Sequence, residues 1–483
     1  MRKYKIIAPI IIKQIRLFII ILFSVTFMIS KKADAQVSKK LDTLFQTLVQ
    51  QNAFSGSVLV ADHGKPIYQK SFGYTNQDTK VPIDKNTMFE LASIAKQFTA
   101  MAIVQLHQKG KLKYEDTLKR YFPELPYSDI TINDLVHHTS GIPDFLGWGA
   151  KEVDITKINF NKDILESLQK NKVKTLFKPG VNTAYSNTNY VLLALIAEKV
   201  SGIDFATYLR KNIFGPLNMM HTQVYGQRYA KNKINNYAYG YIYDPIKDKY
   251  LLSDSTEKYQ LFFDGVAGPY GISSTAEDLL KWDQALYTEK LANKQEIKNV
   301  FAPYLLKDGK PAELMGFPYG FGWMINEPQG FYLHTGGYPG YATLIVRYFK
   351  NQTVIVLMNN YNRINIYELG FNIENIINNR EYAIPEVKKS ATVLSVTAEK
   401  LVKFAGEYRS KDSPDFRFTI VNKDNQLYAQ LTGQSSYKVY PETQNTFFYT
   451  AVEAKIVFAE DKNGRVVKLT LKQNGRELEF IKT

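Results

Sequence analysis

The sequence predicts an α+β protein, in which an antiparallel sheet flanked by helices is followed by a small all-β domain. Strand-like runs open and close the first 380 residues, at 54–68 and 341–358, and helical patterns fill the middle. Strands at both ends of a unit with helices between them favour one sheet packed against helices. After about residue 398 only short strand-like runs recur. A chain of 483 residues is long enough for two or three folded units.

The first unit is predicted to begin with a strand pair and a buried helix. A β-rich run from Phe54 meets a turn at His63-Gly64 and resumes at Pro66, which indicates a hairpin. Residues 93–109 are apolar on most of a helical surface, and Gly110 is placed to end the helix. The sequence then predicts an inserted helical subdomain before the sheet resumes. In the rest of the first unit, helices are expected at 190–200, 276–287 and 366–377. Strands are expected at 321–325, 341–348 and 353–358.

The C-terminal part of the chain differs from the first unit in its sequence pattern. Residues 384–397 are rich in polar residues and contain Pro385, which is typical of a linker. Residues 398–483 hold six short strand-like runs, with strong hairpin signals at Asn463-Gly464 and Asn474-Gly475. The expected units are therefore a hydrophobic leader over 1–35, a first domain over 36–383, the linker, and a small barrel or sandwich over 398–483.

The N-terminus has the pattern of an export signal. Basic residues precede an apolar run over 17–29, and Ala33-Asp34-Ala35 offers a cleavage site of the A-x-A type. We therefore expect an exported protein, periplasmic or extracellular. The alternative is that the segment stays uncleaved and anchors the chain to a membrane, although the apolar run is short for a span.

Composition excludes several kinds of chemistry. The chain has no cysteine, so thiol catalysis, disulfides and Cys-ligated metal sites are excluded. The six histidines form no H-E-x-x-H motif, and no metal or other cofactor is expected. The net charge of +15 becomes about +9 without the leader, spread along the chain. The favoured interpretation is a solvated basic surface with no partner, and anionic polymers of the cell envelope are favoured over nucleic acid as the alternative.

Three short patterns carry the candidate chemistry, and context selects among their copies. Ser-x-x-Lys occurs at Ser93/Lys96, Ser167/Lys170, Ser255/Lys258 and Ser435/Lys438, but only the first opens an apolar helix. At a spacing of three residues, the hydroxyl and the amine share one helix face. A buried amine has a lowered pKa and can accept the serine proton. The other three pairs lie in polar surroundings and are expected at the surface.

Two further patterns follow in the chain. Tyr-x-Asn occurs at Tyr74/Asn76, in an expected turn, and at Tyr185/Asn187, on a loop before a helix. His334-Thr335-Gly336-Gly337 precedes a strand. Its small residues allow a substrate backbone to approach a strand edge, although a glycine-rich turn is the alternative.

The order Ser-x-x-Lys, Tyr-Ser-Asn, His-Thr-Gly resembles the serine β-lactamase/penicillin-binding-protein family, in its branch near class C β-lactamases, D-aminopeptidases and esterases. The resemblance covers about residues 40–380 and implies a β-lactamase/transpeptidase-like fold. The C-terminal module is similar to the small lipocalin-like domains attached to some of these hydrolases. Further similar stretches are Leu135-Val-His-His-Thr-Ser-Gly-Ile-Pro, Lys178-Pro-Gly, Ile213-Phe-Gly-Pro-Leu-Asn-Met and Gly271-Ile-Ser-Ser-Thr-Ala-Glu-Asp-Leu.

The resemblance implies a role for each motif residue. Ser93 would attack a carbonyl and form an acyl-enzyme, with Lys96 and Tyr185 sharing the acid and base work. The backbone N–H groups of Ser93 and Gly337 would form the oxyanion hole. The implied substrate-binding residues are Asn187, His334, Thr335 and Gly336.

One departure bears on the substrate. His334 stands where the penicillin-recognising members carry a lysine, and a histidine supplies positive charge only when protonated. The pattern therefore favours a peptidase, amidase or esterase with weak β-lactam turnover. Small-molecule, peptide or cell-wall substrates are the expected partners. The alternative is a non-enzymatic envelope protein that binds peptidoglycan fragments or β-lactams, but that reading predicts loss of Ser93, Lys96 or Tyr185. An α/β-hydrolase is excluded because no G-x-S-x-G is present.

Overall fold

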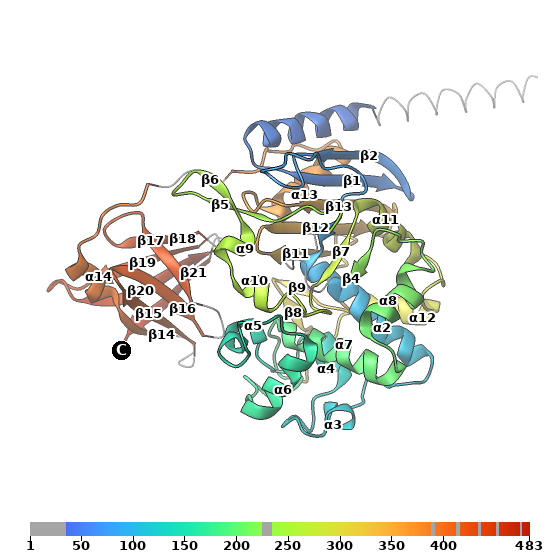
Figure 1. The fold of residues 1–483 in the computed structure, drawn as a ribbon, viewed down its shortest axis with the longest axis horizontal. Helices are drawn as coiled ribbons and strands as arrows, with labels where there is room; N and C mark the ends of the chain where they lie inside the picture. Colours follow the sequence, from blue (N-terminus) through green and yellow to red (C-terminus); the bar gives the residue numbers. More distant parts are fainter. Residues whose placement is uncertain are drawn as a thin grey trace, which may run out of the picture.

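The computed structural model (Figure 1) describes residues 35–224, 234–387, 392–411, 416–432, 436–450, 454–473 and 476–483. Residues 1–34, which hold nearly all of the expected export signal, lie outside the described residues. Within the described parts of the chain, no helix is both long and apolar enough to cross a bilayer.

A six-stranded antiparallel sheet forms the centre of the first domain, in the order β10-β11-β12-β13-β1-β2. Its centre joins the two ends of the domain, because Gly56 of β1 lies opposite Asn359 of β13. The sheet built from both ends of the domain is thus confirmed, as is the first hairpin with its turn at His63-Gly64. The strands are β1 (Gly56–Asp62), β2 (Lys65–Phe72), β10 (Met324–Asn326), β11 (Phe331–Tyr338), β12 (Tyr341–Tyr348) and β13 (Thr353–Asn359).

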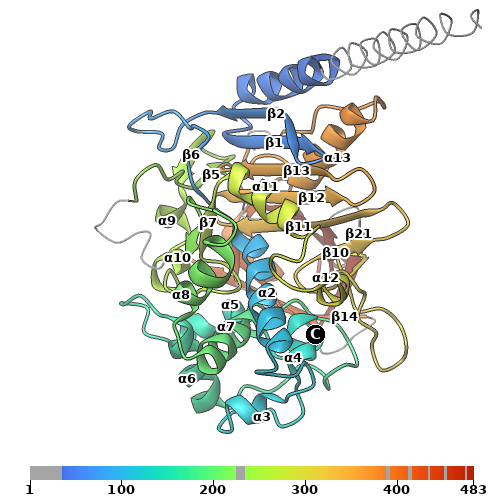
Figure 2. The ribbon, with the colours of Figure 1, turned by 90° about the vertical axis from the view of Figure 1, so that its right-hand side faces the viewer.

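Helices cover both faces of this sheet (Figures 1 and 2). The alternation of side chains along β13 supplies both cores: Val354 and Val356 pack with α2 and α11, whereas Ile355 and Leu357 pack with α13. Both groups are fully buried. The helices that flank the sheet in this way are α2 (Ala95–Gln108), α11 (Ala276–Ala285) and α13 (Ile366–Ile377).

A helix over residues 35–50 also covers the sheet on the α13 side, and it was not predicted. Leu41, Leu44, Phe45 and Leu48 are fully buried in the same core as Ile355 and Leu357. Their spacing of three, four and seven residues is the signal of an amphipathic helix. The helix over residues 35–50 could therefore have been predicted from the sequence.

The helical subdomain lies between β2 and β10 and packs on α2, chiefly through α7. A short three-stranded sheet, β3-β7-β4, ties it to the segment before α2. Its helices are α3 (Leu118–Tyr121), α4 (Ile132–Val136), α5 (Phe145–Trp148), α6 (Asn161–Asn171), α7 (Asn187–Ser201), α8 (Phe205–Leu209), α9 (Ser253–Thr256), α10 (Tyr259–Phe262) and α12 (Lys294–Val300), with single turns η2 (Gly149–Lys151) and η3 (Arg210–Phe214). Its strands are β3 (Phe89–Glu90), β4 (Gln223–Val224), β5 (Tyr241–Asp244), β6 (Lys249–Leu252), β7 (Ile272–Ser274), β8 (Glu313–Leu314) and β9 (Phe317–Pro318).

The C-terminal module is a closed eight-stranded barrel, which decides between the predicted barrel and sandwich. It has its own core, where Phe404 of α14 stacks on Phe458 at a ring distance of 4.3 Å. The predicted turn at Asn463-Gly464 joins two barrel strands, and Asn474-Gly475 lies outside the described residues. The elements are α14 (Ala398–Phe404), β14 (Gly406–Ser410), β15 (Arg417–Lys423), β16 (Gln426–Leu431), β17 (Tyr437–Pro441), β18 (Thr446–Tyr449), β19 (Ala454–Glu460), β20 (Val466–Gln473) and β21 (Arg476–Lys482).

Candidate active site

Ser93 lies in a short 3₁₀ turn, η1 (Ala92–Ile94), which leads directly into α2. The preceding residue, Ala92, has φ of 51°, a left-handed conformation that a non-glycine residue adopts only when its surroundings hold it. The buried carboxylate of Glu90 supplies that support. Its Oε1 accepts hydrogen bonds from the Ala92 N–H at 3.0 Å and from the Gly271 N–H at 2.9 Å.

Lys96 follows one helical turn later and is completely buried. Its Nζ donates to Ser93 Oγ at 3.2 Å, to Asn187 Oδ1 at 2.8 Å and to the Pro269 carbonyl at 3.0 Å. Burial lowers the pKa of Lys96 to about 7, and the nearby Asp144 carboxylate opposes that shift. The amine is therefore a base that can be neutral near neutral pH while it touches the serine hydroxyl.

Tyr185 approaches Ser93 from the loop that precedes α7. Its hydroxyl donates to Ser93 Oγ at 2.6 Å, and its ring lies 4.6 Å from Lys96 Nζ. Burial raises the pKa of Tyr185 well above its ordinary value, because the phenolate would lose its hydration. The phenol is therefore protonated across the whole physiological range. The structure thus brings Ser93, Lys96 and Tyr185 into direct contact.

Asn187 is the first residue of α7 and connects Lys96 to a carboxylate that was not predicted. Its Oδ1 accepts from Lys96, and its Nδ2 donates to Asp144 Oδ2 at 2.8 Å. Burial raises the pKa of Asp144 above its ordinary value. In the sequence, Asp144 directly follows the stretch 135–143, but nothing local distinguishes it from a helix cap, a role that it also fills for α5.

His138 is a second buried residue that the sequence analysis left without a role at the site. Its ring stacks on Tyr185 at 4.5 Å, and its Nδ1 accepts a hydrogen bond from the Ser186 N–H at 3.1 Å. Burial lowers the pKa of His138 well below its ordinary value. The neutral imidazole therefore supports the ring and the backbone of the Tyr185 loop.

The His-Thr-Gly residues lie on β11, whose outer edge is unpaired beyond Leu333 in the described part of the sheet. Gly336 is required there, because a Cβ would come within 2.1 Å of the Leu91 carbonyl oxygen. The strand can thus pack against the turn that carries Ser93. Gly337 is exposed on the same edge, and a Cβ at that position would meet nothing within 4 Å. The Thr335 hydroxyl donates to the Tyr367 hydroxyl at 3.0 Å.

His334, which stands where the penicillin-recognising members carry a lysine, supplies no positive charge here. It is buried, its Nδ1–H donates to the carbonyl of Thr335 at 2.6 Å, and its Nε2 accepts from the Tyr319 hydroxyl at 3.0 Å. Burial lowers its pKa to about 3, and the nearby Lys96 adds to the shift. His334 is therefore neutral at physiological pH, with both ring nitrogens hydrogen-bonded inside the protein.

The remaining copies of the motifs lie apart from this cluster. Ser167 is buried in α6 rather than at the surface as expected, because its side chain faces the subdomain core, whereas Ser255 and Lys258 are exposed. Ser435 lies outside the described residues. Asn76 accepts hydrogen bonds from the N–H groups of residues 78 and 79 in a turn. Across the described ranges, no three His, Asp or Glu side chains are grouped as metal ligands.

Comparison with known proteins identifies the family of the chain. Residues 41–365 match the family model described as beta-lactamase, and residues 391–482 match a domain of unknown function. The chain is 35% identical to penicillin-binding protein 4* of Bacillus subtilis (strain 168) over 452 residues, which cover 92% of this chain and 98% of that protein.

Solved structures share the fold. A penicillin-binding protein from Bacillus halodurans has a TM-score of 0.60 at 26% identity, over 68% of this chain and 98% of its own. A D-amino acid amidase from Ochrobactrum anthropi SV3 has a TM-score of 0.58 at 23% identity, over 72% of this chain and 99% of its own. The chain belongs to the beta-lactamase family and is a serine hydrolase.

Proposed function

We propose that this chain is an exported hydrolase that cleaves amide, peptide or ester bonds through an acyl-enzyme on Ser93. One observation carries the proposal: Ser93 Oγ touches both a buried amine with a lowered pKa and a phenol that stays protonated. A nucleophile in contact with its base and its acid is the arrangement that acyl transfer requires.

The lowered pKa of Lys96 and the raised pKa of Tyr185 support a division of the two proton-transfer roles. Neutral Lys96 takes the proton from Ser93 Oγ as the oxygen forms a bond to the substrate carbonyl carbon. The carbonyl becomes an oxyanion, which the N–H groups of Ser93 and Gly337 stabilise. When the bond to the leaving nitrogen or oxygen breaks, Tyr185 gives that atom its proton and Lys96 restores the proton on Tyr185. Water then attacks the ester carbonyl, and the same two groups act in reverse to free Ser93.

Neutral His334 narrows the class of substrate. A carboxylate-bearing substrate finds no cationic side chain at this position, so we do not expect efficient β-lactam turnover. The resemblance in fold to a D-amino acid amidase supports an amide bond as the target. The basic leader and its A-x-A site support export, which would bring the enzyme to peptides of the cell envelope.

The test is the hydrolysis of p-nitrophenyl acetate by wild type and by Ser93→Ala. Deletion of the nucleophile should lower kcat/KM by roughly a thousandfold or more. Circular dichroism should give the same spectrum for both proteins, because the hydroxyl contributes little to the core. Ser167→Ala is the matched control, since Ser167 also begins a Ser-x-x-Lys sequence but its hydroxyl donates to the Glu152 carbonyl. Activity of Ser93→Ala within about tenfold of wild type would contradict the proposal.

A further inference from the structure

A second functional feature lies just beyond the site, where the catalytic domain meets the barrel. A pocket of about 320 Å³ begins at Gly337 and is lined by Tyr338, Tyr341, Tyr259 and Glu257, and by Tyr437 of the barrel strand β17. Its volume is that of a pocket for a drug-sized ligand, so it can hold part of a substrate. Among the described residues that line it, Glu257 alone carries a formal charge.

Glu257 carries a carboxylate for which no partner lies among the described residues. It makes no side-chain hydrogen bond or ion pair with any described residue, unlike the neighbouring Asp244, which pairs with Lys247. Desolvation raises its pKa, and no cation offsets that effect. An unpaired, partly desolvated carboxylate costs folding free energy, and such groups concentrate at ligand sites.

The other walls of the pocket are suited to the same kind of ligand as the carboxylate. The ring of Tyr338 lies 6.3 Å from that of Tyr259 and 6.5 Å from that of Tyr341. The faces of aromatic rings attract cations, and a carboxylate beside several such faces is complementary to an ammonium group. A substrate carboxylate at this position would instead meet Glu257 as a like charge.

The order of residues along β11 indicates which part of the substrate lies in the pocket. The leaving group must face Tyr185, its proton donor. Tyr185 packs on His138, and His138 contacts Tyr319. Because Tyr319 is hydrogen-bonded to His334, the leaving group lies toward the His334 end of β11. The strand then runs from His334 through Gly337 to Tyr338, away from that cluster. The pocket beyond Gly337 is therefore on the acyl side of the bond that is cleaved.

We infer that Glu257 binds a positively charged amine on the acyl part of the substrate, within a tyrosine-walled pocket that the barrel completes through Tyr437. This inference rests on the proposed function, because it concerns the substrate of the same site. It makes the enzyme selective for amine-bearing amides and peptides, in contrast to the carboxylate selectivity that a lysine at position 334 would favour.

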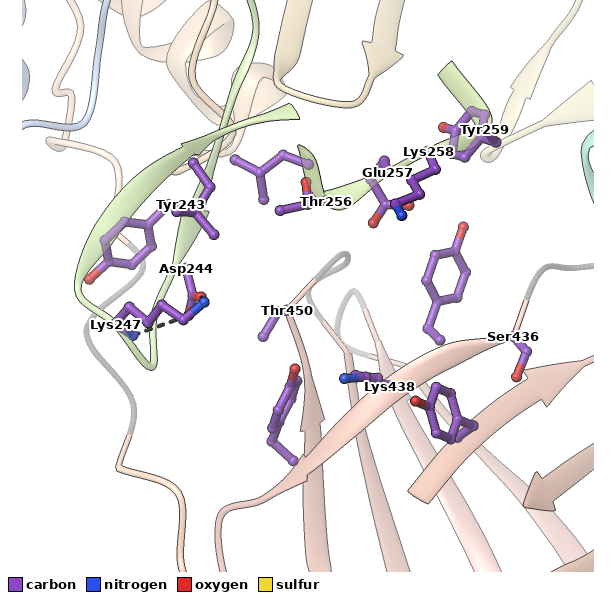
Figure 3. A pocket seen from close by; sticks show the side chains of 15 residues that line it. Tyr243, Asp244, Lys247, Thr256, Glu257, Lys258, Tyr259, Ser436, Lys438 and Thr450 are labelled. Atoms are coloured by element: carbon purple, nitrogen blue, oxygen red, sulfur yellow. Dashed lines mark hydrogen bonds and ion pairs between the residues drawn. The ribbon is translucent and has the colours of Figure 1, made fainter. Parts of the chain in front are cut away.

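The pocket adjoins a larger one of about 480 Å³ between the catalytic domain and the barrel (Figure 3). Residues 256–259 form one side, and Ser436, Lys438 and Thr450 of the barrel form the other. Both pockets share Glu257, Tyr259 and Tyr437. A substrate longer than a single amino acid can therefore continue from the ammonium position toward the barrel.

The test compares p-nitroanilides that differ only by ammonium against methyl. Alanyl anilide, in both enantiomers, is paired with isobutyryl anilide, and β-alanyl anilide with butyryl anilide. Each kcat/KM is divided by the rate of hydrolysis by hydroxide, which removes the inductive effect of the ammonium. Wild type should prefer at least one ammonium substrate by about tenfold or more, and Glu257→Gln should remove most of that preference.

The neutral anilides serve as the internal control for folding, and their kcat/KM in Glu257→Gln should stay within about threefold of wild type. Glu257→Asp keeps the charge and should keep part of the preference for ammonium substrates. This variant still tests the inference if Glu257→Gln does not fold. Asp254→Asn is the matched control, because Asp254 lies three residues earlier, has a pKa raised by burial, and lines neither pocket. That variant should retain the full preference.

Two results would overturn the inference while leaving the acyl-enzyme in place. One is a wild type that cleaves both members of every pair equally well. The other is an ammonium preference that is unchanged in Glu257→Gln. A wild type that cleaves neither anilides nor activated esters would instead contradict the proposed function.

Discussion

At the scale of single residues, burial determines the charge states at this site. Lys96 and His334 are both completely enclosed basic groups, and desolvation lowers the pKa of each. For Lys96 the result is a usable base near neutral pH. For His334 the result is an imidazole that is neutral at physiological pH.

The pKa of Lys96 predicts the pH profile. The amine accepts a proton only in its neutral form, so kcat/KM for a neutral ester should rise with pH through about 7 and then level off, because Tyr185 stays protonated. The Asp144 carboxylate raises the pKa of Lys96, so Asp144→Asn should move the midpoint to lower pH by about 1 unit. The acylation rate is measured by stopped flow from pH 5 to 9, roughly two units on either side of the Lys96 pKa. The two profiles give the midpoint for wild type and for Asp144→Asn. An unchanged midpoint in Asp144→Asn would contradict this electrostatic role.

Local spacing predicted some of these residues and could not predict others. Ser93 and Lys96 are one helical turn apart, so their contact follows from the helix itself. Tyr185 and Asn187 were found by their motif and its order in the chain. Asp144 and His138 act through contacts with residues more than forty positions away, and no local pattern marks them. A mostly neutral His334 is expected from the ordinary pKa of histidine, but the burial that lowers this pKa further could not be predicted, because it depends on the fold.

At the scale of elements, the site depends on the close approach of β11 to the turn before α2. Gly336 lacks a Cβ where one would strike the Leu91 carbonyl, and Thr343 of β12 donates to the same carbonyl at 2.8 Å. The strands of the sheet and the long helices were predictable from their hydrophobic patterns. The 3₁₀ turn at Ser93 was not, because its left-handed Ala92 is held by the Glu90 carboxylate, which also accepts a hydrogen bond from the distant Gly271 N–H.

At the scale of the whole molecule, two units with separate cores share a substrate surface. The barrel has its own closed sheet and core, and yet its β17 strand contributes Tyr437 to both pockets beside the catalytic site. The resemblance in sequence indicated a separate module but not where it docks, since docking depends on surfaces that have no periodic pattern. The barrel is therefore placed to influence which substrates are cleaved.

A chain that ends at residue 387 tests this division of roles. Because the barrel core is separate, the shortened chain should fold, which a cooperative thermal transition would show. Its kcat/KM on p-nitrophenyl acetate should stay within about threefold of the full chain, since the acid, base and nucleophile precede the linker. Its preference for ammonium anilides should fall, because Tyr437 is lost and the pocket opens to solvent. Failure to fold would show that the catalytic domain depends on the barrel for stability, and an unchanged preference would show that the barrel does not complete the pocket.

The central claim is that Ser93 forms the covalent intermediate, and the most direct measurement is the mass of the intact protein after reaction with a fluorophosphonate. The serine oxygen displaces fluoride from phosphorus, so wild type should gain the mass of one phosphonyl group. Peptide mapping should place that group on Ser93. The Ser93→Ala protein should gain nothing under the same conditions, while Ser167→Ala should be labelled like wild type. An adduct that persists in Ser93→Ala, or that maps to another residue in wild type, would contradict the account.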